Sequence, residues 1–135
     1  MPPFSLLQRF YLTSLDLPVS DPGVDGAGAS GIACVSDSDK LAGMLSWDPP
    51  KDRPSLFIAT WSLSESPIAF RNRILDHSNR FDYFLIAYQD RFQQIDNLQF
   101  FRAWAGQHTE VAWHESKITH MPGNRYLFGI RRDRQ

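Results

Sequence analysis

Residues 55–61 read SLFIATW, and together with residues 82–88, DYFLIAY, they decide the fold class. Each stretch is a nearly continuous apolar run, which is typical of a strand that is buried on both faces. Between them lies IAFRNRILDH (68–77), preceded by Ser66 as an N-cap and Pro67 as a first helical residue. The segment therefore predicts a strand, a helix and a second strand, which is the unit that joins two parallel strands.

A second helix and an antiparallel pair of strands follow this unit. Residues 95–108, IDNLQFFRAWAGQH, carry apolar residues on one helical face, with Asp96 or Asn97 as the N-cap. VAWHE (111–115) and RYLFGI (125–130) are predicted strands, and a Pro-Gly-Asn turn lies between them. The whole order predicts an α/β fold with a mostly parallel sheet that ends in an antiparallel hairpin.

The sequence before residue 55 gives weaker signals. Residues 4–15, FSLLQRFYLTSL, predict an amphipathic helix, and the Gly- and Pro-rich residues 16–30 predict a flexible loop. GIACVSD (31–37) predicts a short strand and residues 39–45 a short helix, whereas three prolines within residues 48–54 exclude regular structure there. We expect a single, truncated domain over the whole chain of 135 residues.

Composition excludes several classes of function. The formal charge of −1 gives no basic field for nucleic acid, and one cysteine excludes an internal disulfide and a cysteine-rich zinc site. The four histidines lack the spacing of a zinc pair, so no metal is expected. No apolar run approaches the roughly 20 residues of a membrane-spanning helix. No secretory signal is visible either, so a cytoplasmic protein without membrane contact is the default expectation.

Three longer strings carry a resemblance to a known family. SLFIATWSLSESP (55–67), FDYFLIAYQDRFQQIDNLQFF (81–101) and HMPGNRYLFG (120–129) resemble segments of sugar O-methyltransferases. These lie in the C-terminal part of the Rossmann-like methyltransferases that use S-adenosylmethionine (SAM). LLQRFYL (6–12) resembles the helix that follows the second strand in such enzymes. The resemblance implies a partial Rossmann-like sheet and methyl transfer from SAM to a hydroxyl of a saccharide or another small molecule.

The chain departs from this family at its start. Such enzymes open with a strand, a Gly-rich turn and a helix, followed by a second strand that ends in an acidic residue. The turn lets the backbone approach the cofactor, and the acid binds the ribose hydroxyls. The cluster GVDGAG (23–28) does not follow a strand and is interpreted as a loop. We therefore expect a sheet without its first two strands and without the Gly-rich motif.

This departure has a physical consequence for residues 55–61. Without a neighbouring strand they become a long apolar sheet edge, which is a site for pairing or aggregation. The alternative to an enzyme is thus a non-catalytic fragment or interaction subunit that pairs with another chain or with itself.

Ligands in open α/β sheets bind beyond the carboxyl ends of the strands, and this rule selects the candidate site residues. Asp37 is a candidate for the cofactor's adenine, or a surface-turn residue. Trp61 and Ser62 are candidate cofactor contacts, and Trp61 could stack on a ring or belong to the core. Glu65 is a candidate base for a substrate hydroxyl, or a carboxylate that favours the positive end of a helix dipole.

The third place that the rule selects, after residues 82–88, and the hairpin segment supply the remaining candidates. Gln89 follows residues 82–88, and its amide can both donate to and accept from sugar hydroxyls. Asn124 and Arg125 are further candidate substrate contacts, although Asn124 also belongs to a turn. Histidine is the side chain type that ordinarily exchanges a proton near neutral pH, so His120 in the hairpin segment is a candidate catalytic residue, or a structural one.

Overall fold

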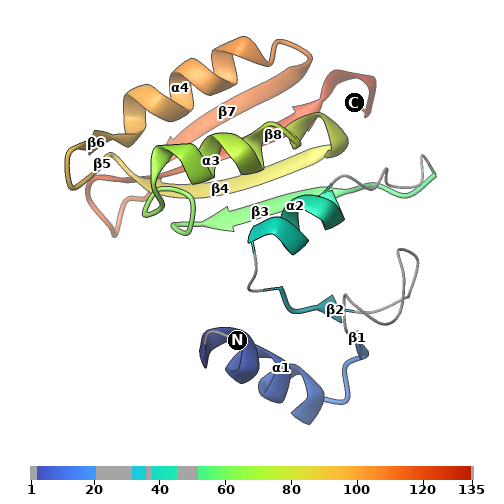
Figure 1. Cartoon of the computed structure of the whole chain (residues 1–135). Helices are drawn as coiled ribbons and strands as arrows, with labels where there is room; N and C mark the ends of the chain where they lie inside the picture. The colour runs from blue at the N-terminus through green and yellow to red at the C-terminus, as the bar shows by residue number, and fades with distance from the viewer. Residues whose placement is uncertain (1–2, 21–31, 36–37, 46–51, 135) are drawn as a thin grey trace. The chain divides into compact units, whose positions relative to one another are not determined.

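The structure is a computed structural model, and it describes residues 3–20, 32–35, 38–45 and 52–134 (Figure 1). The chain forms two compact units, Met1–Asp48 and Pro49–Gln135.

The first unit consists of short elements. They are α1 (Pro3–Ser14), β1 (Val19–Ser20), β2 (Ile32–Ala33) and α2 (Ser38–Leu45). Strands β1 and β2 pair in parallel. The two predicted helices are confirmed, and the strand predicted over 31–37 is confirmed only at Ile32 and Ala33. The cluster at residues 23–28 lies outside the described residues.

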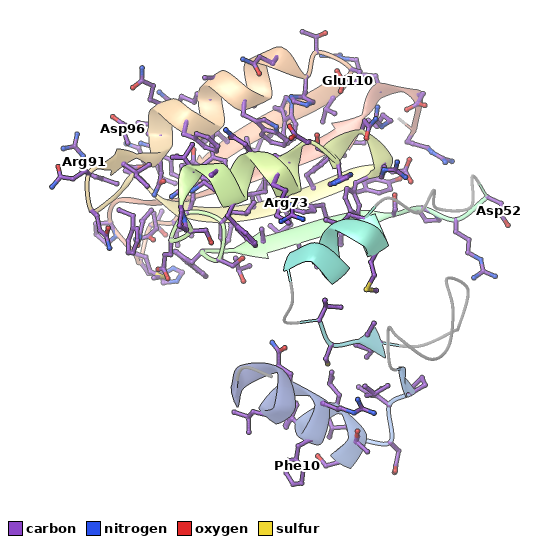
Figure 2. All side chains as sticks on the ribbon, viewed as in Figure 1. Phe10, Asp52, Arg73, Arg91, Asp96 and Glu110 are labelled. Carbon is purple, nitrogen blue, oxygen red and sulfur yellow. The ribbon has the colours of Figure 1, made fainter. Side chains whose placement is uncertain are left out.

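The second unit contains the main sheet. Its elements are β3 (Leu56–Thr60), α3 (Ile68–Leu75), a 3-10 turn (Ser78–Arg80), β4 (Tyr83–Gln89), β5 (Arg91–Phe92), β6 (Ile95–Asp96), α4 (Asn97–Gln107), β7 (Val111–Lys117), β8 (Asn124–Arg131) and a last 3-10 turn (Arg132–Arg134). Strands β5 and β6 form a small antiparallel hairpin, where Arg91 and Asp96 lie 4.0 Å apart (Figure 2).

The strand order of the main sheet is β3-β4-β8-β7. Strands β3 and β4 are parallel, as the strand–helix–strand unit predicted. Strand β8 is antiparallel to both β4 and β7, so the predicted final hairpin is also confirmed. The sheet is mixed rather than mostly parallel, because β8 lies between β4 and β7 and only one pair is parallel.

Helices α3 and α4 lie on one face of this sheet and form the core with it (Figure 1). The sheet contributes the buried side chains of Phe84, Ile86 and Leu127 to this core. Helix α4 contributes the buried side chains of Phe101 and Trp104. Strand Tyr83–Gln89 is therefore a buried central strand, as its apolar run predicted.

The prediction that the first strand is buried on both faces is wrong for β3. Leu56 and Ile58 are 51% and 58% exposed, and they lie on the face opposite to the helices. Phe128 and Ile130 of β8 lie in register with Leu85 and Tyr83 on this same face and are partly exposed. The reason is that both helices of the second unit cover the other face, which an apolar run alone does not reveal.

Of the two predicted helix N-caps in the second unit, the one of α4 is confirmed and the one of α3 is wrong. Asp96 is the N-cap of α4, and its carboxylate accepts a hydrogen bond from the Gln99 amide at 2.9 Å. Ser66 is not the N-cap of α3, because its hydroxyl donates to the Ser62 carbonyl at 2.6 Å. Pro67 takes the N-cap position instead, so α3 begins one residue later than predicted.

Candidate functional site

The carboxyl ends of β3 and β4 bring together residues that are distant in sequence. Trp61 follows β3, and its indole Nε1 donates to Oδ1 of Asn124 at 2.8 Å. Asn124 begins β8 and lies opposite Gln89, the last residue of β4. The sheet order thus places Trp61, Gln89 and Asn124 at one end of the sheet, where the α/β ligand rule locates a binding site.

The backbone of Trp61 adopts an unusual conformation. Its φ of 61° lies in the left-handed region, which a bulky residue rarely occupies and which costs about 1–3 kcal/mol. The surrounding turn holds it there: the Trp61 carbonyl accepts from the Glu65 amide at 3.0 Å and from the Ser64 hydroxyl at 2.9 Å. Backbone strain of this kind concentrates at binding sites, so it supports a functional role for this turn.

A buried arginine fixes the turn to the rest of the unit. Arg71 of α3 is fully buried, and it donates to the carbonyls of Ser64 and Ser66 at 2.6 and 2.8 Å. Its Nη1 donates to Oδ1 of Asn97 at 2.6 Å, and Asn97 Nδ2 donates to the Gln89 carbonyl at 2.9 Å. Burial lowers the pKa of Arg71. One side chain therefore links the loop after β3 to the start of α4 and, through Asn97, to the end of β4.

Sequence reasoning missed this role of Arg71. A signal was present, because Arg71 lies three and four positions before Ile74 and Leu75, on the buried face of α3. A charged residue on the apolar face of a short helix indicates a buried polar network.

A second network lies at the same end of the sheet. Arg125 pairs with both oxygens of Asp90, and its Nη1 contacts Glu115 Oε1 at 2.9 Å. Glu115 also accepts from Tyr88 Oη at 2.8 Å and from two nitrogens of Arg102. The hydrogen bonds from Arg102, together with those from Tyr88 and the charge of Arg125, lower the pKa of Glu115 to about 2. Burial and the contact with Glu115 raise the pKa of Tyr88.

A cavity of about 350 Å³ opens beside this network. Asp90, Lys117, Thr119, Asn124 and Arg125 line it. Its wall therefore combines a carboxylate, two cations, a hydroxyl and an amide, which supplies both hydrogen-bond donors and acceptors. We refer to this cavity, together with Trp61, which is hydrogen-bonded to the lining residue Asn124, as the carboxyl-edge site.

The remaining predicted site residues lie on the loops that leave this edge of the sheet. Ser62 and Glu65 are exposed in the turn after β3, and His120 is exposed in the loop between β7 and β8. Within the described part of the chain, no side-chain hydrogen bond joins Glu65 to His120. Asp37 lies outside the described residues.

A larger groove of about 1080 Å³ runs along α3 and α4, away from the predicted site residues. Ser78 and His108 lie in its wall, with 3.2 Å between Ser78 Oγ and His108 Nε2. His108 Nδ1 lies 2.9 Å from the Trp104 carbonyl, so a proton on Nδ1 satisfies that oxygen. This geometry also explains the end of α4, because His108 is its C-cap.

Comparison with known proteins gives no assignment: no protein-family model and no curated protein matches the chain. In residues 3–20, 32–35, 38–45 and 52–134, no group of three or more His, Cys, Asp or Glu residues could hold a metal ion. None of the helices described is long and apolar enough to cross a membrane.

Proposed function

We propose that this chain is a methyltransferase-like binding domain that holds a hydroxylated small molecule of the saccharide type at the carboxyl-edge site. The observation that carries this proposal is the hydrogen bond between Trp61 and Asn124. It holds the indole ring of Trp61, whose backbone conformation is strained, against Asn124, which lines a polar cavity.

The chemistry of the wall supports a hydroxylated ligand. A sugar hydroxyl both donates and accepts, and the cavity offers Asp90 and the Asn124 amide beside Lys117 and Arg125. An aromatic ring next to such groups can pack on the apolar face of a sugar ring. The volume of about 350 Å³ lies at the small end of the range for ligand pockets, which suits one sugar unit.

Methyl transfer from SAM is the activity that the family resemblance implies. In that reading, Trp61 and Ser62 would contact the cofactor, and Glu65 or His120 would accept the proton of the substrate hydroxyl. The described residues do not fit the cofactor on their own, because no described strand pairs with the outer edge of β3. The family's Gly-rich turn and acidic residue would lie on that side.

Thermal unfolding with added ligands tests the proposal. A ligand at ten times its Kd that binds only the folded chain adds about 1.4 kcal/mol, which raises the Tm by several degrees. We expect D-glucose, L-rhamnose or L-fucose to raise the Tm, and S-adenosylhomocysteine to leave it unchanged. A Tm raised by S-adenosylhomocysteine and by none of the sugars would favour a cofactor site and contradict the proposal.

Two tryptophan variants serve as a matched pair in this experiment. Trp61→Phe and Trp113→Phe each remove one indole hydrogen bond, the latter to the His108 carbonyl at 3.1 Å. Of the two, only Trp61 is hydrogen-bonded to a residue that lines the cavity, so only Trp61→Phe should abolish the sugar-dependent rise in Tm. An equal loss in both variants would show that the effect does not arise at this site.

A further inference from the structure

Strand β3 presents unpaired backbone groups on its outer edge. The Trp61 amide donates to the Ala87 carbonyl at 2.7 Å, so residue 61 directs its N–H group toward β4. Because backbone direction alternates along a strand, Leu56, Ile58 and Thr60 direct their N–H and C=O groups away from β4. Among the described residues, no backbone group bonds to Leu56 or Ile58 on that side.

This edge lacks the features that usually prevent strand pairing. Edge strands are commonly protected by lysine, proline, a bulge or an inward charge, and LFIAT (56–60) contains none of these residues. The side chains of Leu56 and Ile58 are more than half exposed on the open face of the sheet. Apolar side chains and unpaired backbone groups therefore occur at the same two residues.

We propose that β3 pairs antiparallel with β3 of a second copy of this chain, around a two-fold axis at Ile58. In this register Ile58 lies opposite Ile58, and Leu56 lies opposite Thr60. The outward groups of the two Ile58 residues satisfy each other, and the Thr60 amide donates to the Leu56 carbonyl. The Thr60 carbonyl already accepts from the Ser62 amide at 2.8 Å, and its second lone pair receives the Leu56 amide. Neither strand carries a charge, so no repulsion opposes the pairing of two identical edges. The strand is thus complementary to itself.

The size of the contact sets its strength. A strand of five residues spans about 17 Å, and one strand pair buries far less than the roughly 800 Å² per partner of a standard interface. The dimer is therefore weak and dissociates in the micromolar range or above. This inference does not rest on the proposed function, since ligand binding uses the carboxyl-edge site and pairing uses the edge of β3.

Sedimentation equilibrium of the full chain over a range of concentrations tests the pairing. We expect a reversible monomer–dimer equilibrium, which Ile58→Pro weakens by at least about 10-fold in Kd. The proline removes the outward N–H group in both copies and leaves the β3–β4 hydrogen bonds intact. A chain that is monomeric at every concentration would overturn the proposal. It would do so even if the edge of β3 is covered by another segment of the chain or by another protein.

A matched pair of lysine variants separates edge pairing from packing of the open sheet faces, and covers the case in which Ile58→Pro does not fold. Ile58→Lys places a charge at the edge, and Ile130→Lys places one on the same face in β8, away from the edge. Edge pairing predicts that Ile58→Lys gives a monomer and that Ile130→Lys still dimerises. A dimer lost only in Ile130→Lys would contradict the proposal and indicate face-to-face packing.

Discussion

The indole Nε1 of Trp61 donates a hydrogen bond to Oδ1 of Asn124, although the two residues are 63 positions apart in the sequence. Trp61 follows β3, and Asn124 begins β8, while β4 lies between these strands in the sheet. The bond therefore crosses the end of β4 and ties the turn after β3 to the final hairpin. It thereby fixes the side chain of Asn124, one of the residues that line the cavity.

The coupling between these two residues can be measured by a double-mutant cycle. Trp61→Phe and Asn124→Ala each remove one partner of a part-buried hydrogen bond. We expect an interaction energy of about 1 kcal/mol in urea unfolding, with each single variant less stable than the parent chain. Effects that simply add would show that the bond does not contribute to stability.

Arg71 should be more sensitive to conservative substitution than its exposed neighbour Arg73. The planar guanidinium reaches three acceptors on Ser64, Ser66 and Asn97, and an ammonium cannot reproduce that fork. We expect Arg71→Lys to lower the free energy of unfolding by about 3 kcal/mol. Arg73→Lys on the same helix should change it by less than about 0.5 kcal/mol.

Denaturant unfolding of both arginine variants provides the measurement. Similar small losses for the two would show that Arg71 does not hold the turn after β3. Sugar-dependent stabilisation should also fall in Arg71→Lys, because the turn that carries Trp61 loses its anchor.

In the second unit, the sequence predicted the helices and strands better than it predicted which of their faces are buried. The apolar run of β4 and the Asp96 cap of α4 are local signals, and both are confirmed. The exposure of Ile58 could not be predicted, because it depends on which face of the sheet the helices cover. The pattern of apolar residues along a strand can be read from the sequence. Whether a layer of helices covers a given face of the sheet cannot be read from it.

The candidate site was predicted only in part, for a related reason. The rule on strand ends selected Trp61 and Gln89, and the predicted hairpin supplied Asn124 and Arg125; the structure brings these residues to one edge of the sheet. The contact between Trp61 and Asn124 depends on the insertion of β8 beside β4, which the chain order does not specify. The anchoring role of Arg71 depends on carbonyl groups of a turn whose shape no sequence pattern indicated.

Glu115 should make the fold sensitive to acid. Its pKa of about 2 in the folded chain lies below the ordinary value of about 4.3, so its contribution to stability is complete above that value. The contribution is lost as the pH falls toward 2, when the carboxylate accepts a proton and releases Arg102 and Arg125. Glu115→Gln should cost about 2 kcal/mol at neutral pH and flatten the loss of stability between pH 5 and about pH 2.

Urea unfolding at a series of pH values checks this prediction. Glu110→Gln is the control, since Glu110 is exposed just before β7 (Figure 2). Parallel pH profiles for the parent chain and Glu115→Gln would contradict the ion-pair network.

Two glycines should respond to alanine in opposite directions. A Cβ atom at Gly129 would lie 2.5 Å from the Trp113 ring and 2.9 Å from Val111, so Gly129→Ala should cost about 1–3 kcal/mol. Gly106 lies in α4 with open space at the Cβ position, and Gly106→Ala should stabilise the chain by about 0.5–1 kcal/mol. Tm values measured by circular dichroism distinguish the two, and a stabilising Gly129→Ala would disprove the close packing of Trp113 on β8.

The most direct test of a ligand site at the carboxyl edge follows the indole N–H signals in ¹H–¹⁵N correlation spectra. The chain has four tryptophans, and Trp61→Phe identifies the signal of Trp61 by its loss. On titration with D-glucose, L-rhamnose or L-fucose, we expect the Trp61 signal to shift and saturate while those of Trp104 and Trp113 stay in place. A Trp61 signal that no sugar moves, or equal shifts of all the indole signals, would contradict a saccharide site beside Trp61 and Asn124.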